Sequence, residues 1–183
     1  MPRSSWVETL MVMEADGTAL TTNNVSTSVI NPQAKLLLKP GYFDRIGKGL
    51  RIHGSGRVTT ANSVSSAHAV SVLCGATTIF TSLFSSMNNN GAATNLPFTF
   101  EIKLVCRAIG TSANVFGAGT ISANYLDTTG FSPILAGTLS ASPPAVGTSF
   151  DATASQTVDF QMNILTAAIS SIQLHTYFVE SLN

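Results

Sequence analysis

The chain has 183 residues, enough for one domain with a sizeable core, and 44% of them are hydrophobic. Only 10% are charged, and nine basic residues balance nine acidic ones. This composition excludes a disordered tail, which would be poor in apolar residues and rich in net charge. It also argues against nucleic-acid binding, which depends on clustered Lys and Arg. Such a weakly charged surface is unusual for a free monomer. It is better explained if neighbouring subunits cover much of it.

The first seventeen residues differ from the rest of the chain. Ser5 followed by Glu8 matches a capping box, which favours a short helical turn, whereas an extended arm or an extra edge strand is the alternative. We therefore assign residues 1–17 to an N-terminal arm or short helical turn and residues 18–183 to the main domain. Four apolar side chains of the arm are expected to lie outside that domain and to form an interface with a partner: Trp6, Leu10, Met11 and Met13.

No signal peptide or membrane span is expected. Polar and charged residues follow Met1-Pro2-Arg3 closely and leave no continuous apolar region near the N-terminus. No window approaches the ~18 apolar residues of a membrane span. We expect synthesis in a cytoplasm and no contact with a membrane.

Beyond the arm, apolar and polar residues alternate with a period of two, which is typical of half-buried antiparallel strands. The clearest runs are 50–60, 97–109, 157–165 and 172–182, and shorter strands are expected at 20–30, 35–39, 69–74, 77–83 and 115–125. The alternation predicts an inward-facing set: Phe98, Phe100, Ile102, Leu104, Phe160, Met162, Ile164, Leu174 and Phe178.

Two glycines, Gly54 and Gly56, interrupt the inner face of the run 50–60. They predict either a bend or a large side chain from the opposing sheet that fills the gap. Turn residues separate the runs, at Asn31-Pro32, Pro40-Gly41, 88–91, Thr129-Gly130 and Pro143-Pro144. About eight strands without intervening helices predict an all-β, antiparallel β-sandwich, and a jelly roll fits the count best.

We find no residues in the sequence that predict catalysis or a metal or cofactor site, and we expect no enzymatic activity. The histidines His53, His68 and His175 are too far apart in sequence for two of them to bind a metal from one strand. Gly54-Ser55-Gly56 lacks the spacing of a nucleophile elbow. Cys74 and Cys106 lie among apolar residues and are expected to be small buried hydrophobes rather than a disulfide or metal pair.

Three segments carry a resemblance to a known family. From Pro40 to Val58 an aromatic pair and an Ile-Gly-Lys turn lead into a strand of the form Leu-Arg-Ile-x-Gly-x-Gly-x-Val. This stretch is similar to a pattern of tailed-phage virion proteins. The segment from Pro97 to Arg107 resembles their long central strand, and the segment from Leu174 to Asn183 resembles their C-terminal strand. The likeness covers residues 35–183 and implies a jelly-roll module on the outside of a phage particle, often a trimer or a capsid-attached decoration.

Two functions follow from these observations. The first is a capsid decoration or minor capsid protein that forms a homo-oligomer, in the resemblance a trimer, and binds the major capsid protein or another virion protein. The alternative is a tail-tip or fibre-head module that recognises a host-surface glycan. Its candidate loops contain Tyr125 with Asp127 and the residues from Asn88 to Asn90. A hydrolase is the third alternative, for which we find no group of catalytic residues.

Overall fold

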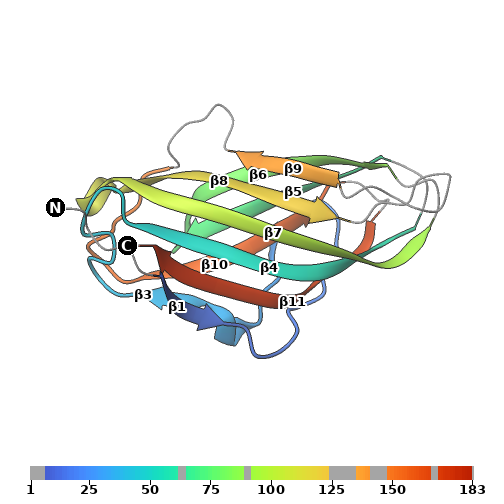
Figure 1. The fold of residues 1–183 in the computed structure, drawn as a ribbon, viewed down its shortest axis with the longest axis horizontal. Coiled ribbons are helices and arrows are strands. Elements are labelled where there is room, and N and C mark those ends of the chain that lie inside the picture. The colour runs from blue at the N-terminus through green and yellow to red at the C-terminus, as the bar shows by residue number, and fades with distance from the viewer. Residues whose placement is uncertain are drawn as a thin grey trace.

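The computed structural model describes residues 7–61, 65–88, 92–123, 135–140, 148–165 and 169–182. Two antiparallel sheets pack face to face, and the larger sheet faces the viewer in Figure 1. The described residues contain no α-helix and only two 3-10 turns, η1 (Pro32–Ala34) and η2 (Gly110–Ser112). Their strands are β1 (Val7–Val12), β2 (Thr27–Ser28), β3 (Leu36–Leu38), β4 (Gly49–Thr60), β5 (Ser65–Cys74), β6 (Thr77–Asn88), β7 (Ala93–Ala108), β8 (Asn114–Ala123), β9 (Leu135–Ser140), β10 (Gln156–Ile164) and β11 (Ile169–Leu182).

The strand order is that of a jelly roll. The larger sheet runs β1-β11-β4-β7-β8-β9, and the smaller runs β2-β10-β5-β6, with β3 also pairing β10. The first strand therefore lies beside the last, and the chain repeatedly crosses between the sheets. The hairpin of β8 and β9 extends the larger sheet beyond the eight strands of a simple jelly roll. The predicted all-β jelly-roll sandwich is confirmed.

The core between the sheets agrees with most of the alternation read from the sequence. Eight of the nine side chains predicted to face inward are buried: Phe98, Phe100, Ile102, Leu104, Phe160, Met162, Ile164 and Leu174. Phe100 of β7 and Phe160 of β10 stack across the core with their ring centroids 4.7 Å apart. This contact joins the middle of one sheet to the middle of the other.

The prediction for Phe178 is wrong because β11 contains an irregularity. Leu174 pairs with Gly56 and Thr176 pairs with Ser55, so His175 is an extra residue between two adjacent ladder positions. Such a bulge reverses the alternation downstream. Tyr177 and Val179 are consequently buried, and Phe178 lies on the outer face.

The two glycines of β4 are covered from within their own sheet, not from the opposing sheet as one of our alternatives had it. Gly54 pairs with Phe100 and Gly56 pairs with Phe98 on the neighbouring strand β7. A Cβ at Gly56 would lie 2.7 Å from Cζ of Phe98, and one at Gly54 would lie 3.0 Å from Cε1 of Phe100. Each phenylalanine ring thus occupies the space that its cross-strand partner leaves free.

The N-terminal segment forms an extra edge strand rather than a helical turn. Residues 7–12 pair with β11 as strand β1, and the backbone amides of Met13 and Gly17 donate to the carbonyls of Tyr177 and Leu174. The segment then leaves the larger sheet: Leu20 bridges Ile172 of β11, whereas Asn23 bridges Ile164 of β10. The long strand expected over 20–30 is therefore reduced to β2, because this stretch crosses between the sheets.

Two of the predicted turns are present. Tyr42 donates its backbone amide to the carbonyl of Lys39, and Gly41 has a φ of 71°, as a type II turn with Pro at its second position requires. Asn31 caps η1, because its side-chain oxygen accepts a hydrogen bond from the amide of Gln33. The turns expected at 129–130 and 143–144, and most of 88–91, lie outside the described residues.

Candidate functional site

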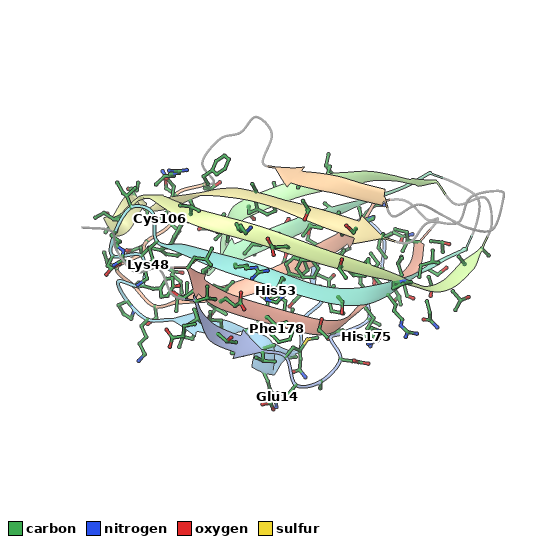
Figure 2. The ribbon with its side chains drawn as sticks, viewed as in Figure 1. Glu14, Lys48, His53, Cys106, His175 and Phe178 are labelled. Carbon is green, nitrogen blue, oxygen red and sulfur yellow. The ribbon has the colours of Figure 1, made fainter. Side chains whose placement is uncertain are left out.

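Polar and charged side chains from distant parts of the sequence lie together on the outer face of the larger sheet. Strand pairing places outward side chains of β11, β4, β7 and β8 in rows across the sheet. One row contains Glu180, Arg51 and Lys103, the next contains Phe178, His53, Glu101 and Thr120. The labelled His53 and Phe178 lie on this face in Figure 2. Side chains from distant parts of the sequence thereby become neighbours.

Arg51 is the centre of a charge network on this face. Its Nε donates to Oε2 of Glu101 at 2.8 Å, and its Nη1 donates to Oε2 of Glu180 at 3.2 Å. Lys103 Nζ lies 2.8 Å from Oε1 of Glu101. Hydrogen bonds from Lys103 and Arg51 lower the pKa of Glu101, and the hydrogen bond to Glu101 raises the pKa of Arg51. The network fixes these side chains and leaves little uncompensated charge.

A row of hydroxyl groups crosses the sheet next to this network. Thr176 of β11 pairs with Ser55 of β4, Ser55 pairs with Thr99 of β7, and Thr99 pairs with Ser122 of β8. Thr176 Oγ1 lies 2.7 Å from Ser55 Oγ and accepts a hydrogen bond from the Ser55 amide at 2.9 Å. The bulge at His175 makes this contact possible, because it turns Thr176 toward the outer face.

The short hydroxyl side chains leave a shallow depression of about 330 Å³ in the outer face. Its lining combines hydroxyls with one carboxylate and one imidazole: His53, Gly54, Ser55, Thr99, Phe100, Glu101, Thr120, Ser122 and Thr176. At its border, the ring of His53 stacks on the ring of Phe178 with centroids 4.9 Å apart and an interplanar angle of 9°. The depression therefore combines hydroxyl groups with a flat aromatic neighbour.

Three of the four side chains predicted to form an interface with a partner lie against or within the core of the chain itself. Leu10 and Met11 are half-buried and pack against the core, and Met13 is buried within it. Trp6 lies outside the described residues. The exposed apolar side chains of β1 are instead Val7 and Val12, with 58% and 44% of their surface accessible. A contact between the N-terminal segment and a partner remains a prediction.

The candidate glycan loops lie outside the part of the chain with described side chains, at Tyr125, Asp127 and residues 88–90. Among the described residues, no three His, Cys, Asp or Glu side chains form a group suited to a metal ion. Cys74 and Cys106 are buried and free, as expected of small buried hydrophobes, and burial raises the pKa of both thiols. No described helix is long and apolar enough to cross a membrane.

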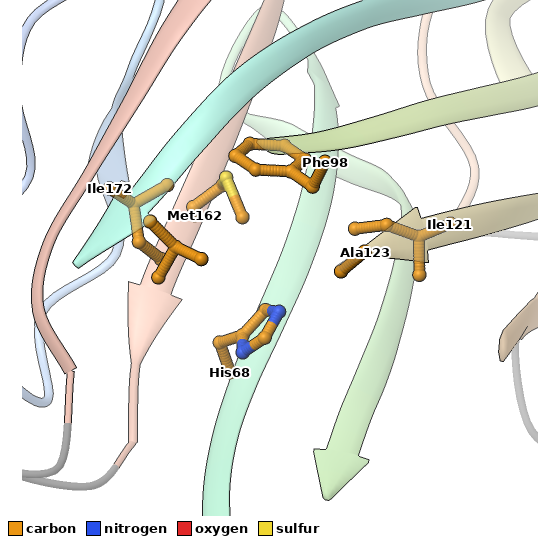
Figure 3. Close-up of a pocket in the computed structure, with 7 residues that line it drawn as sticks. His68, Phe98, Ile121, Ala123, Met162 and Ile172 are labelled. Carbon is orange, nitrogen blue, oxygen red and sulfur yellow. The ribbon is translucent and has the colours of Figure 1, made fainter. Parts of the chain in front are cut away.

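A second, much smaller cavity lies inside the sandwich beside His68 (Figure 3). Apart from His68 its lining is apolar: Val58, Phe98, Ile121, Ala123, Met162 and Ile172. Burial lowers the pKa of His68 to about 4 from a usual value of 6.5. This imidazole is consequently neutral at physiological pH and belongs to the core rather than to a surface site.

Strand order and packing define the chain as a jelly-roll β-sandwich protein. No protein-family model matches the sequence, and no curated protein sequence matches it either. Among solved structures, the chain is similar to the CBM2 module of the evolved Dit of Lactobacillus casei BL23 phage J-1, with 9% identity, a TM-score of 0.39, and 99% of this chain and 98% of that chain covered. It is also similar to a Lotus tetragonolobus seed lectin isoform, with 6% identity, a TM-score of 0.33, and coverage of 100% and 95%. Neither likeness is close enough to assign a function.

Proposed function

We propose that the chain is a non-enzymatic structural protein of a tailed-phage virion, either a capsid decoration or a minor capsid protein. It binds the particle and copies of itself through protein–protein contacts. The resemblance of residues 35–183 to virion proteins supports this role, and the jelly-roll frame that this resemblance implies agrees with the observed strand order.

The observation that carries the proposal is the neutral surface. The chain has only nine basic and nine acidic residues, and many of them neutralise one another. Lys35 forms an ion pair with Asp159, and Lys48 forms one with Asp44. The network of Arg51 contains three further charged residues, Glu101, Glu180 and Lys103. The formal net charge is zero, so there is little net repulsion to keep copies of the protein apart in solution. Such a surface suits a protein whose faces are covered in an assembly.

The edge strand β1 is the part of the surface that we expect to contact the particle. Val7 and Val12 are exposed on it, and Val12 pairs with Phe178 of β11 in an apolar pair on the outer face. A stable contact buries more than ~1,000 Å² in total. We expect the predicted Trp6 contact to extend this surface.

Light scattering of the purified chain and co-sedimentation with particles test the proposal together. We expect a homo-oligomer at micromolar concentration, a trimer if the family resemblance holds, and saturable binding to particles that lack the protein. Trp6→Ala should weaken particle binding. Leu37→Ala is the matched control, because Leu37 is an apolar side chain 62% exposed on the opposite sheet. A monomer that does not bind particles would contradict the proposal.

Point variants are better suited to this test than removal of residues 1–17. Residues 7–12 pair with β11, and Met13 is part of the core. Their deletion would expose the edge of β11 and remove a buried side chain, so a loss of binding would not separate contact from folding.

The second candidate function is recognition of a host-surface glycan by a tail-tip or fibre-head module. The hydroxyl-lined depression on the larger sheet favours it. Separate head and tail fractions distinguish the two functions, because a decoration protein stays with heads and a recognition module stays with tails.

A further inference from the structure

The depression on the outer face of the larger sheet has the size of a small ligand site. Its volume of about 330 Å³ lies at the lower end of the ~300–1,000 Å³ that ligand pockets occupy. It is open rather than enclosed, so a ligand would lie across the strands with one face still in contact with solvent. This shape suits the end or the side of a longer molecule.

The lining offers both donors and acceptors at short spacing. Each Ser or Thr hydroxyl donates one hydrogen bond and accepts others, whereas the ionised carboxylate of Glu101 only accepts. Thr99 and Thr120 are exposed, and no described group hydrogen-bonds their hydroxyls. Thr99 pairs with Ser122, and Glu101 pairs with Thr120, so these four side chains form a compact square on β7 and β8. A ligand with several adjacent hydroxyls matches this arrangement.

The charges around the depression indicate a ligand without net charge. Glu101 is the only carboxylate in the lining, and Arg51 and Lys103 already compensate it. An anion would meet this carboxylate, and a cation would compete with two fixed positive groups. A neutral polyhydroxylated molecule is neither repelled by the carboxylate nor in competition with the positive groups.

Part of the site is held in place before any ligand arrives. Ser55 and Thr176 hydrogen-bond to each other, and Thr176 also accepts from the Ser55 amide. The aromatic stack of His53 on Phe178 borders the same surface. Apolar C–H faces of a sugar ring pack on such flat aromatic surfaces while the ring hydroxyls bond to polar neighbours.

We propose that this depression binds a neutral saccharide, with Thr99, Thr120 and Glu101 contacting the sugar hydroxyls. The inference deepens the glycan-recognition candidate. It does not depend on where in a particle the chain sits, because the site lies within a single domain.

The test uses the purified full chain and an array of neutral and anionic oligosaccharides, followed by calorimetry with the best-binding neutral oligosaccharide. The variant Thr99→Val/Thr120→Val removes two hydroxyls but keeps the shape and strand preference of the side chains. Each lost hydrogen bond should weaken binding by roughly threefold to tenfold. Thr81→Val is the matched control: Thr81 is an exposed strand residue on the other sheet, 3.1 Å from the hydroxyl of Ser71. It should bind as the unchanged protein does.

Binding that the double variant weakens and the control preserves supports the proposal. No binding of any neutral oligosaccharide at millimolar concentration overturns it. Binding that the double variant leaves unchanged also overturns it, because the saccharide site must then lie elsewhere. If the double variant instead reduces co-sedimentation with particles while no sugar binds, this face is a protein contact and the saccharide assignment is wrong.

Discussion

Strands β4 and β7 have opposite chemistry on their two faces. Leu50, Ile52, Ile102 and Leu104 are fully buried on the inner face. Between them on the same strands, the outer face contains Arg51, His53, Glu101 and Lys103 in a network of ion pairs and hydroxyls. Adjacent residues therefore contribute to different properties of the protein. The inner face forms the core, and the outer face carries the polar side chains of the proposed saccharide site.

This separation follows from the period of two in a strand. A substitution at one position acts on the core, and a substitution at the next position acts on the surface. If substitutions at neighbouring positions changed the free energy of unfolding equally, the two faces would not have these separate roles.

The largest expected difference in the free energy of unfolding is between substitutions at Phe100 and at Thr99. Phe100 is 5% exposed, stacks on Phe160 and covers Gly54. Phe100→Ala removes this ring and should lower the free energy of unfolding by roughly 3–5 kcal/mol. Thr99→Ala, on the exposed side of the same strand, should lower it by less than about 0.5 kcal/mol. Urea denaturation of both variants measures the difference, and equal small effects would contradict the assigned faces.

The next effect concerns pH and the buried His68. Its pKa is about 4 in the fold and near 6.5 in the unfolded chain. Below pH 6.5 the unfolded state binds a proton that the folded state rejects, so this contribution to stability is full above pH 6.5 and is lost as the pH falls toward 4. The loss amounts to about 3 kcal/mol.

Denaturation at pH 7 and pH 4.5 tests this expectation. His68→Leu should remove most of the pH dependence between these values, because leucine fits the apolar lining and does not titrate. A variant with the same pH slope as the unchanged protein would show that other groups cause the slope.

The smallest effect is expected on the outer face. Glu101→Gln removes the charge that Arg51 and Lys103 share. All three side chains are partly exposed, and such ion pairs contribute about 0–1 kcal/mol. The free energy of unfolding should change by no more than that, and 1 M salt should reduce the difference further. A loss comparable to that of Phe100→Ala would mean that the outer face is also structural.

The sequence predicted the strands that alternate regularly and failed where the backbone departs from that pattern. In β4, β7 and β10 every second side chain is buried over most of the strand, so their inward residues could be read directly. In β11 the extra residue His175 reverses the alternation, and nothing in the local sequence marks it. The error at Phe178 follows from that one residue.

The candidate site was harder to predict than the fold, because it depends on strand order. The alternation of the strands implies outer faces for Arg51 and Glu101, but these residues are 50 positions apart, and Glu180 is 129 positions from Arg51. Only the pairing of β11, β4 and β7 brings them together. The hydroxyl row has the same origin, because Thr176, Ser55, Thr99 and Ser122 come from four strands.

The virion role itself is tested most directly by locating the chain in purified phage particles. Quantitative mass spectrometry of separated heads and tails gives both its presence and its copy number. The proposed function predicts that the chain is found in the head fraction at a copy number that matches sites on the capsid. Its presence in tails alone would favour the recognition module, and its absence from both fractions would contradict a structural role in the particle.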